Sequence, residues 1–314
     1  MNIAIVGVGA VGGVFGARLI AAGHTVHFIA RGNTLTALRA NGLQLTSIDG
    51  DLSLPHVHAT NDIASIGVVD VVLVCVKSTQ VASIAPTLAP MVGPRTAVIP
   101  LQNGVEASTQ LAQALGEANV LEGLARVIAE QTGPGVIRHM AVTPVIEFGA
   151  RMRTPADSLA REQIAAFAQA VNAAGMHAIV PESMELALWE KFLFIDPFGT
   201  VGAATREPIG VMRADPDVRA LLDRCLAEVQ AVGVACGVEM PNSAVKRTWE
   251  RYDSLPPEST TSMQRDLIAR RPSEFELQTG SVVRLGRAHH VPTPVHDVLY
   301  AVLKPAATAG GTPI

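Results

Sequence analysis

The sequence Gly7-Val8-Gly9-Ala10-Val11-Gly12 decides the fold of the N-terminal half. It follows a short apolar run, Ile3–Val6, and precedes apolar residues that recur at helical spacing up to Ala22. Glycines spaced as G-x-G-x-x-G between a strand and a helix are typical of dinucleotide-binding Rossmann domains. The first glycine permits a tight turn, the second lets the backbone approach a pyrophosphate, and the third lets the helix pack closely on the sheet. We therefore predict a dinucleotide site at these six residues, against the alternative of a merely structural glycine loop.

The residue after the second predicted strand indicates which nicotinamide nucleotide binds. Thr25–Ala30 is predicted as that strand, and Arg31 follows it. An NAD site normally carries Asp or Glu about 20 residues after the glycines. A carboxylate would repel a 2′-phosphate, whereas a guanidinium can bind it through two hydrogen bonds. Arg31 therefore favours NADP(H), unless it is only a solvated surface arginine.

The alternation of strands and helices ends past the middle of the chain. Val68–Val76 and Thr96–Leu101 are apolar runs typical of strands buried on both faces. Later strands are expected at Val136–Arg138, Val142–Phe148 and His177–Val180, and helices over Glu182–Phe194, Val218–Cys236 and Ser281–Ala288. We predict an α/β fold, with a doubly wound Rossmann sheet over residues 1–181, an all-helical domain over residues 182–304 and a disordered tail over residues 305–314.

Composition excludes several classes of function. The 314 residues carry a formal net charge of -4, and 48% of them are hydrophobic, so the chain can fill two cores and lacks the basic excess of nucleic-acid-binding proteins. No apolar run approaches the ~20 residues of a membrane helix, and no signal peptide is expected at the N-terminus. Cys75, Cys225 and Cys236 are too few and too scattered for a disulfide framework or a zinc site. We expect them to be buried thiols of a cytoplasmic protein.

Several short motifs, separated in the sequence, occur in an order and at a spacing that together are informative. They are Gly7–Gly12, Val76-Lys77-Ser78-Thr79-Gln80, Leu101-Gln102-Asn103-Gly104, Leu188-Trp189-Glu190-Lys191-Phe192, and Thr261-Ser262-Met263-Gln264-Arg265-Asp266 with Glu274 following. Together they resemble the ketopantoate reductases (2-dehydropantoate 2-reductases), NADPH enzymes of pantothenate synthesis, over nearly the whole chain from Met1 to about Lys304. The resemblance implies NADPH-dependent reduction of a 2-oxo acid to a 2-hydroxy acid, with 2-dehydropantoate or a close analogue as substrate.

The resemblance also implies roles for polar residues near strand ends and in the second domain. Lys77 and Asn103 follow predicted strands, and ligands bind beyond strand ends in open α/β sheets. Lys77 would contact the cofactor or the substrate, and Asn103 the nicotinamide ribose and the substrate. Ser262 would contact the substrate carboxylate. Glu274 would take part in catalysis by binding a substrate hydroxyl and stabilising the Lys191 ammonium, and would also contact the cofactor. Taken alone, Lys77 could be a lysine that reaches water from a strand end and Asn103-Gly104 a turn.

Lys191 is the predicted proton donor. It lies among Trp189, Phe192 and other apolar residues, and partial removal from water lowers the pKa of a lysine, which makes it a better acid near neutrality. Hydride delivery to a ketone leaves negative charge on the carbonyl oxygen, and a nearby acid must neutralise it. The resemblance assigns this step to Lys191. The alternative is a lysine whose stem packs while its ammonium reaches water.

Two positions depart from the family pattern. The family presents asparagines four and eight residues after the lysine, on one helix face, where this chain has Ile195 and Gly199. We expect the substrate pocket to have lost two amides and to have gained an apolar wall and some space. An unpaired substrate hydroxyl or carboxylate would cost about 1–3 kcal/mol, so a bulkier, more apolar keto acid is an alternative substrate. Pro197 distorts this turn and leaves open whether Asp196 enters the pocket.

The remaining features of the sequence concern a metal site, an alternative class of function and the expected partners. His56 and His58 alternate along the chain but lack a third ligand, so no metal site is expected. A non-catalytic NADP-binding redox sensor is the alternative from another class, and Lys191 and Glu274 argue against it because a sensor needs no proton donor. The expected partner is a small-molecule 2-oxo acid, with no nucleic acid and no membrane, and the sequence leaves a homodimer open.

Overall fold

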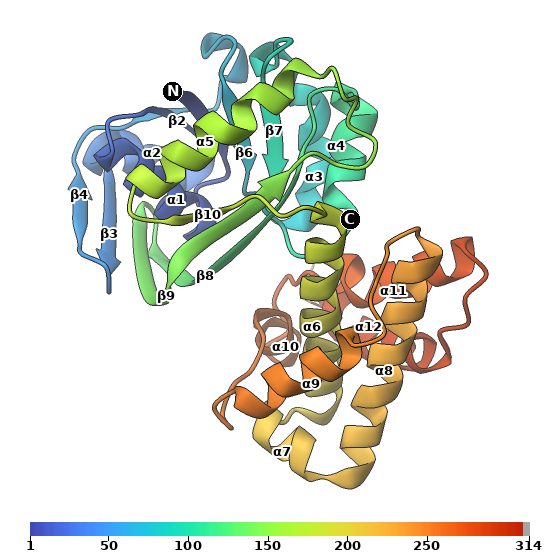
Figure 1. Ribbon diagram of the computed structural model, residues 1–314. Helices are drawn as coiled ribbons and strands as arrows, with labels where there is room; N and C mark the ends of the chain where they lie inside the picture. The colour runs from blue at the N-terminus through green and yellow to red at the C-terminus, as the bar shows by residue number, and fades with distance from the viewer. Residues whose placement is uncertain (310–314) are drawn as a thin grey trace. The chain divides into compact units, whose positions relative to one another are not determined.

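The computed structural model describes residues 1–309 and divides them into two compact units (Figure 1). Unit 1 comprises Met1–Gln102 and Ala107–Met184, and unit 2 comprises Asn103–Glu106 together with the described residues from Glu185 onward. The domain boundary predicted after residue 181 therefore lies three residues earlier than this division. The segment Asn103–Glu106 groups with the helical unit, which the sequence did not predict.

Unit 1 contains a parallel five-stranded sheet in the order β5-β2-β1-β6-β7. Its strands are β1 (Asn2–Val6), β2 (Thr25–Ile29), β5 (His58–Thr60), β6 (Val71–Val74) and β7 (Ala97–Pro100). The strand order reverses at β1, so the connections after β1 and β6 leave toward opposite faces and a crevice forms beyond the strand ends. This confirms the predicted Rossmann-like sheet.

Helices cover both faces of this sheet, because successive side chains of a strand point to opposite sides. Ile3 and Ile5 of β1 join one apolar core with Phe15 of α1 (Ala10–Ala21), whereas Ala4 and Val6 join a second core with Leu88. The other helical segments of unit 1 are α2 (Gly32–Asn41), η1 (Ile63–Ser65), η2 (Ser78–Gln80), α3 (Val81–Ile84), η3 (Ala85–Met91), α4 (Ala107–Leu115), η4 (Leu159–Arg161) and α5 (Glu162–Ala173). Burial on both faces explains why the strands are nearly continuous apolar runs.

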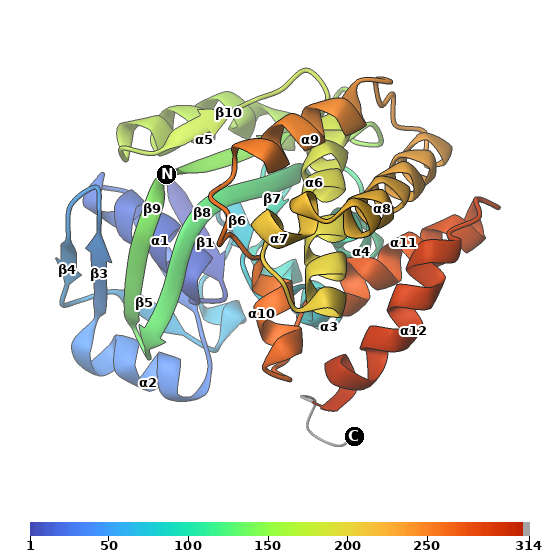
Figure 2. The same cartoon turned by 90° about the horizontal axis from the view of Figure 1, so that it is seen from below.

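A second sheet packs on the other side of α1 (Figure 2). It contains β3 (Leu43–Ser47), β4 (Leu52–Leu54), β8 (Glu122–Gly133), β9 (Val136–Gly149) and β10 (His177–Ile179). The long strand β9 pairs with β8 along one edge and with β3 and β10 along the other. The sequence predicted β9 as two separate strands and missed β8, so these two predictions were wrong. Gly135, with φ +74, closes the β8–β9 turn.

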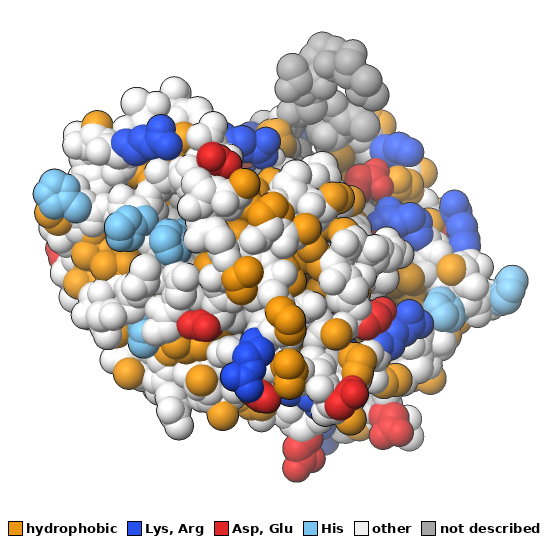
Figure 3. All heavy atoms as spheres, turned by 90° about the horizontal axis from the view of Figure 1, so that it is seen from above, with side chains coloured by type: hydrophobic (Ala, Val, Ile, Leu, Met, Phe, Trp, Pro, Cys, Tyr) orange, Lys and Arg blue, Asp and Glu red, His pale blue; other side chains and the backbone are white. Residues whose placement is uncertain are grey.

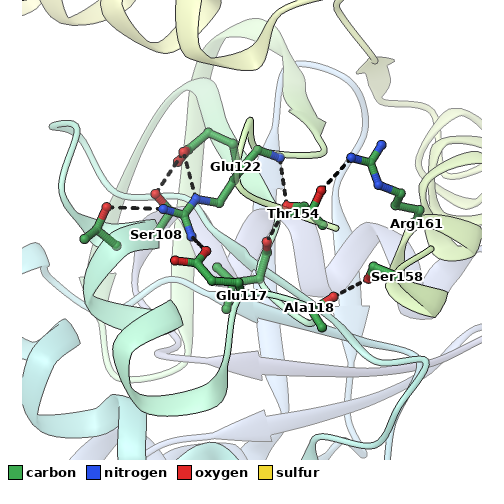
Figure 4. Close-up of polar contacts among 10 residues, drawn as sticks. Ser108, Glu117, Ala118, Glu122, Thr154, Ser158 and Arg161 are labelled. Carbon is green, nitrogen blue, oxygen red and sulfur yellow. Dashed lines mark hydrogen bonds and ion pairs between the residues drawn. The ribbon is translucent and has the colours of Figure 1, made fainter. Parts of the chain in front are cut away.

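A buried polar cluster ties α4 to the start of β8 (Figure 4). Ser108 of α4 donates to the Glu122 carboxylate at 2.8 Å, and the guanidinium of Arg151, 7% exposed, binds Glu117 at 2.7 Å. Thr154 donates to the Val120 carbonyl at 3.1 Å. The buried charges are therefore paired and hydrogen-bonded, which is the condition for tolerating them in a core.

The regular secondary structure described in unit 2 is helical, as predicted. Its helices are α6 (Met184–Thr205), α7 (Ile209–Ala214), α8 (Pro216–Ala235), α9 (Ala244–Ser254), α10 (Ser262–Ile268), η5 (Phe275–Leu277), α11 (Thr279–Ala288) and α12 (Pro294–Ala309). Helix α6 continues through Pro197 and is longer than predicted. Helix α12 includes residues 305–309, so that part of the predicted disordered tail is wrong, and residues 310–314 lie outside the described residues.

The surface agrees with the mild net charge. On the face shown in Figure 3, basic side chains are scattered among acidic, apolar and neutral ones. Within residues 1–309, no helix has both the length and the apolar character that a membrane span requires. Cys225 is buried as expected, whereas Cys75 and Cys236 are only partly buried.

Candidate active site

A cavity of about 370 Å³ lies in unit 1 beyond the carboxyl ends of β1, β2 and β6. Its wall includes the segment Gly7–Gly9 after β1, Arg31 after β2 and Lys77 after β6. This is the switch point of the sheet, where ligands of open α/β folds bind. Three elements distant in sequence thus bring part of the predicted cofactor set to one cavity, namely Gly7, Val8, Gly9, Arg31 and Lys77, whereas Asn103 and Glu274 are not among its lining residues.

The three glycines of the motif occupy three different environments. Gly7 has φ +99, and a Cβ on it would lie 2.8 Å from the Val76 backbone nitrogen. A Cβ on Gly12 would lie 2.1 Å from the Gly7 carbonyl oxygen, so only glycine allows α1 to pack this closely on the turn. Apart from its neighbours in the chain, a Cβ on Gly9 would meet no atom of the described residues within 4 Å, although Gly9 lines the cavity. The backbone there leaves space for a ligand that a side chain would fill.

Helix α1 begins at Ala10, and its N-cap, Gly9, provides no side-chain hydrogen bond. The first N–H groups of a helix lack partners within the helix and carry the positive end of its dipole, so they bind phosphate. Together with the space at Gly9, this geometry fits a dinucleotide pyrophosphate.

Two exposed cations, Arg31 and Lys77, face the same cavity. Arg31 is the N-cap of α2, so it lies beside the N–H groups of a second helix start. Thr34, Gln80 and Gln131 also line the cavity and were missed by the sequence analysis. Gln131 comes from β8, a strand that was itself not predicted, and the sequence carries no motif that would have identified it.

Gln102 fixes the turn that carries Lys77. Its Nε2 donates to the carbonyl oxygens of Val74 and Val76, at 2.8 Å each. Gln102 is 5% exposed, so these bonds lie away from water. Gln102 belongs to the motif Leu101-Gln102-Asn103-Gly104, but only the structure shows that it supports the end of β6.

Lys191 lies in unit 2 on α6 and is buried, with 8% of its surface exposed. Its neighbours Trp189, Phe192 and Leu193 enter the core of the unit, and the Trp189 and Phe192 rings meet edge to face. The burial agrees with the predicted partial removal of this lysine from water.

Asn103 and Glu274, each predicted as a site residue, meet within unit 2. Asn103 Nδ2 donates to Glu274 Oε2 at 2.9 Å, and Gln278 Nε2 donates to the same oxygen at 3.4 Å. Gln278 is 2% exposed, so the second amide is held in the core. Both amides bind one carboxylate oxygen, and Glu274 Oε1 takes part in neither bond.

Of the two positions that depart from the family pattern, Gly199 is occupied differently from expectation. Ile195 is half-buried and packs against the core of unit 2. A Cβ on Gly199 would lie 2.8 Å from Met263 Cε and 2.9 Å from Thr261 Oγ1. The extra space expected at Gly199 is therefore filled by the start of α10, whose first residue is Ser262. Gly199 brings this segment onto α6, and Ser262 itself is exposed.

Asp196 belongs to a buried ionic cluster. Its Oδ2 lies 2.9 Å from His296 Nε2, its Oδ1 accepts from Thr200 at 3.1 Å, and it is 0% exposed. Glu228 Oε2 lies 2.6 Å from His296 Nδ1, so both ring nitrogens face carboxylates. Burial alone would lower the pKa of His296, but the bonds with Asp196 and Glu228 outweigh it and raise the pKa to about 9. The Asp196 carboxylate is thus engaged with α12 and does not face the side of α6 that carries Ile195.

Comparisons with known proteins agree with these features. The family model "Ketopantoate reductase PanE/ApbA" matches residues 3–152, and "Ketopantoate reductase PanE/ApbA C terminal" matches residues 183–307. A 2-dehydropantoate 2-reductase of Mesorhizobium japonicum is 30% identical over 99% of both chains. The chain belongs to the ketopantoate reductase family. It is therefore an oxidoreductase that acts on CH–OH groups, in a family that uses nicotinamide nucleotides.

Solved structures extend this comparison. A PanE/ApbA family ketopantoate reductase from Ralstonia eutropha JMP134 superposes with a TM-score of 0.86 at 30% identity, covering 99% of each chain. D-mandelate dehydrogenase with NADH and anilino(oxo)acetate superposes with a TM-score of 0.87 at 18% identity, covering 99% of this chain and 100% of the other. The second likeness shows the fold alone.

The ketopantoate reductase fold here carries one further histidine arrangement. His58 of β5 lies beside His27 of β2, with ring centroids 5.5 Å apart. Among residues 1–309, no group of three or more His, Cys, Asp or Glu side chains is arranged to hold a metal ion.

Proposed function

We propose that this protein reduces a 2-oxo acid to the 2-hydroxy acid with NADPH, with 2-dehydropantoate and pantoate as the first candidate pair. The observation that carries the proposal is the combination, in unit 2, of buried Lys191 with the bonded pair Asn103 and Glu274. A nicotinamide bound in unit 1 would supply the hydride. We further propose that the enzyme acts in the cytoplasm, in pantothenate synthesis.

Lys191 supplies the proton in this scheme. The hydride adds to C2 of the 2-oxo acid, the C=O π bond breaks, and the oxygen takes a proton from the Lys191 ammonium. The neutral amine then regains a proton from water. General acid catalysis by a positioned group contributes about 10²–10⁴-fold. Asn103 and Glu274 orient the substrate through an amide donor and a carboxylate acceptor, and Ser262 is proposed to bind the substrate carboxylate.

The nucleotide proposed is NADP(H) because the cavity of unit 1 carries Arg31 and Lys77, and none of the described residues in its lining is acidic. A 2′-phosphate brings additional negative charge, which a guanidinium binds through two parallel hydrogen bonds. The residues proposed to hold the cofactor are Gly7, Val8, Gly9, Ala10, Val11, Gly12, Arg31, Lys77, Asn103 and Glu274.

A bulkier, more apolar 2-oxo acid is the second candidate substrate. The face of α6 that follows Lys191 presents Ile195, and Met263 covers Gly199 with a thioether side chain. Neither side chain can bond a substrate hydroxyl as an amide would. A branched or aryl side chain would lose no hydrogen bond at such a wall, whereas an unpaired hydroxyl costs about 1–3 kcal/mol.

A panel of 2-oxo acids tests the proposal, with NADPH consumption followed by absorbance and the product identified by mass spectrometry. The panel contains ketopantoate, branched aliphatic 2-oxo acids and aryl 2-oxo acids. The proposal expects at least one of them to be reduced with a kcat/KM in the ordinary enzyme range, about 10⁴ M⁻¹s⁻¹ or more. Tight NADPH binding without oxidation by any member would contradict it.

Ile195→Asn separates the two substrate candidates. The change restores an amide one helical turn after Lys191 and should raise kcat/KM for ketopantoate relative to an apolar 2-oxo acid by about tenfold or more. The matched control is Ile195→Val, which keeps the wall apolar. Gly199→Asn is not used, because its Cβ would collide with Met263. If the wild-type enzyme already reduces ketopantoate with a kcat/KM of about 10⁵ M⁻¹s⁻¹ or more, Ile195 does not disfavour this substrate.

A further inference from the structure

Charged side chains next to Asn103 and Glu274 hold the segments that carry these two residues together in unit 2. Asn103–Glu106 follows β7, whereas Glu274 lies just before η5, far away in sequence. Glu106 ends the first segment, and Glu276 lies in η5, two residues after Glu274. A side chain that binds both Glu106 and Glu276 therefore also holds the segment of Asn103 against the segment of Glu274.

Arg284 of α11 makes that connection. Its NH2 group donates to Glu106 Oε2 at 2.8 Å and to the Glu276 carbonyl oxygen at 2.8 Å, and NH1 donates to Glu276 Oε2 at 3.3 Å. Ser281, one turn earlier on α11, also donates to Glu106. One guanidinium thus binds both segments through donors on two nitrogens, a planar fork that the single nitrogen of an ammonium does not reproduce.

Two packing features support the same arrangement. Gly104, with φ +101, lies so near η5 that a Cβ on it would be 2.5 Å from the Leu277 carbonyl oxygen. A Cβ on Gly280 would lie 2.9 Å from Arg284 NH1 and 2.9 Å from Glu276 Oε2. Both glycines therefore stand where close approach of the segments requires them.

Helix α12 completes the support of η5. Tyr300 donates its hydroxyl to the Glu276 carboxylate, with its oxygen 2.9 Å and 3.0 Å from the two carboxylate oxygens. The rings of Phe275 and Tyr300 stack with centroids 5.2 Å apart and planes 7° from parallel. Phe275 is 1% exposed, so the residue between Glu274 and Glu276 is fixed in the core.

We propose that Arg284 is a positioning residue, which locks Asn103–Glu106 onto η5 so that the Asn103 amide and the Glu274 carboxylate meet in one geometry. Its side chain is 43% exposed, so its ion pairs alone would stabilise the protein little. The role lies in geometry, because displacement of a substrate-orienting group by about 1 Å can lower a rate about 100-fold. The inference rests on the proposed function only for the roles of Asn103 and Glu274.

Hydrogen–deuterium exchange of the resting protein tests the lock without any substrate. In Arg284→Ala, backbone amides of residues 103–106 and of η5 should exchange about tenfold faster than in wild type. Arg287→Ala is the matched control, because Arg287 lies one turn further along α11 and pairs with Asp297 at 2.7 Å on the surface. Unchanged exchange in Arg284→Ala, or equal increases in both variants, would overturn the proposal whatever the enzyme reduces.

A kinetic double-mutant cycle tests the consequence for catalysis, with the 2-oxo acid that the panel identifies. Arg284→Ala should lower kcat about 10–100-fold in the wild type, but less than about twofold in an Asn103→Ala background, because the geometry it maintains is then already lost. Arg284→Lys should recover only part of the loss. Equal factors in both backgrounds would show that Arg284 does not act through Asn103 and would refute the positioning role. If no 2-oxo acid is reduced, the proposed function is wrong. The exchange experiment alone then tests whether Arg284 holds Asn103–Glu106 against η5.

Discussion

Raising the pH above neutrality should destabilise unit 2 through His296. The imidazole has an ordinary pKa of 6.5 and a pKa of about 9 in the fold, where Asp196 and Glu228 bond its two nitrogens. A group whose pKa is raised by folding stabilises the fold fully below its unfolded value and loses that contribution as the pH rises through its folded value. The two pKa values correspond to about 3 kcal/mol, of which roughly 2 kcal/mol should be lost between about pH 6 and pH 8.5.

Urea unfolding followed by tryptophan fluorescence measures this effect in the right unit, because both tryptophans, Trp189 and Trp249, belong to unit 2. The pH stays below about 8.5, since the raised pKa of buried Tyr252 also favours unfolding at higher pH. Asp196→Asn removes one of the two carboxylates and should shift the loss to lower pH and reduce it. Asp297→Asn changes a surface carboxylate beside His296, paired with Arg287, and should leave the pH dependence intact.

A free energy of unfolding that stays constant between about pH 6 and pH 8.5 would refute this reasoning. Equal pH dependence in wild type and Asp196→Asn would refute it as well, because the ion pair with Asp196 would then not raise the pKa of His296. Removal of His296 alone is a poorer test, because it leaves two carboxylates buried without their partner.

Three further predictions concern the site. Arg31→Ala should weaken NADPH binding by about tenfold or more and leave NADH binding nearly unchanged, as titration calorimetry can show; equal losses would remove Arg31 from 2′-phosphate recognition. Lys191→Ala should lower kcat about 10²–10⁴-fold while NADPH still binds, and near-normal turnover would exclude Lys191 as the acid. Gly9→Ala should fold normally but bind NADPH poorly, since its Cβ enters the cavity, whereas Gly12→Ala should lower Tm because its Cβ meets the Gly7 carbonyl. Equal thermal stability and binding in the two glycine variants would contradict these separate roles.

Much of unit 1 was predictable because its signals are local. Gly7, Gly9 and Gly12 lie close together in the sequence, and the space around each agrees with the role that its spacing predicts. The buried parallel strands are apolar runs that need no partner to be recognised. Strand β8 was missed because its second half is polar and half-exposed, and its pairing with β9 depends on a turn at Gly135.

The arrangement of unit 2 was less predictable because its contacts join distant residues. Lys191 was placed on a helix, but the continuation of α6 through Pro197 depends on bonds from α9 and α12, such as Tyr252 to the Phe194 carbonyl at 2.7 Å. The space at Gly199 could not be judged from sequence, since Met263, which fills it, lies on another helix. Likewise, nothing near His296 in the sequence indicates that two carboxylates from α6 and α8 enclose it.

Transfer of a labelled hydride tests the central claim most directly. The purified protein is supplied with NADPH deuterated at the transferable position of the nicotinamide and with ketopantoate or the best 2-oxo acid of the panel, and the product is analysed by mass spectrometry. The account predicts a 2-hydroxy acid with one deuterium on C2, formed in equal amount to the NADPH consumed, and a large loss of this product in Lys191→Ala. Bound NADPH that transfers no deuterium to any 2-oxo acid would contradict it.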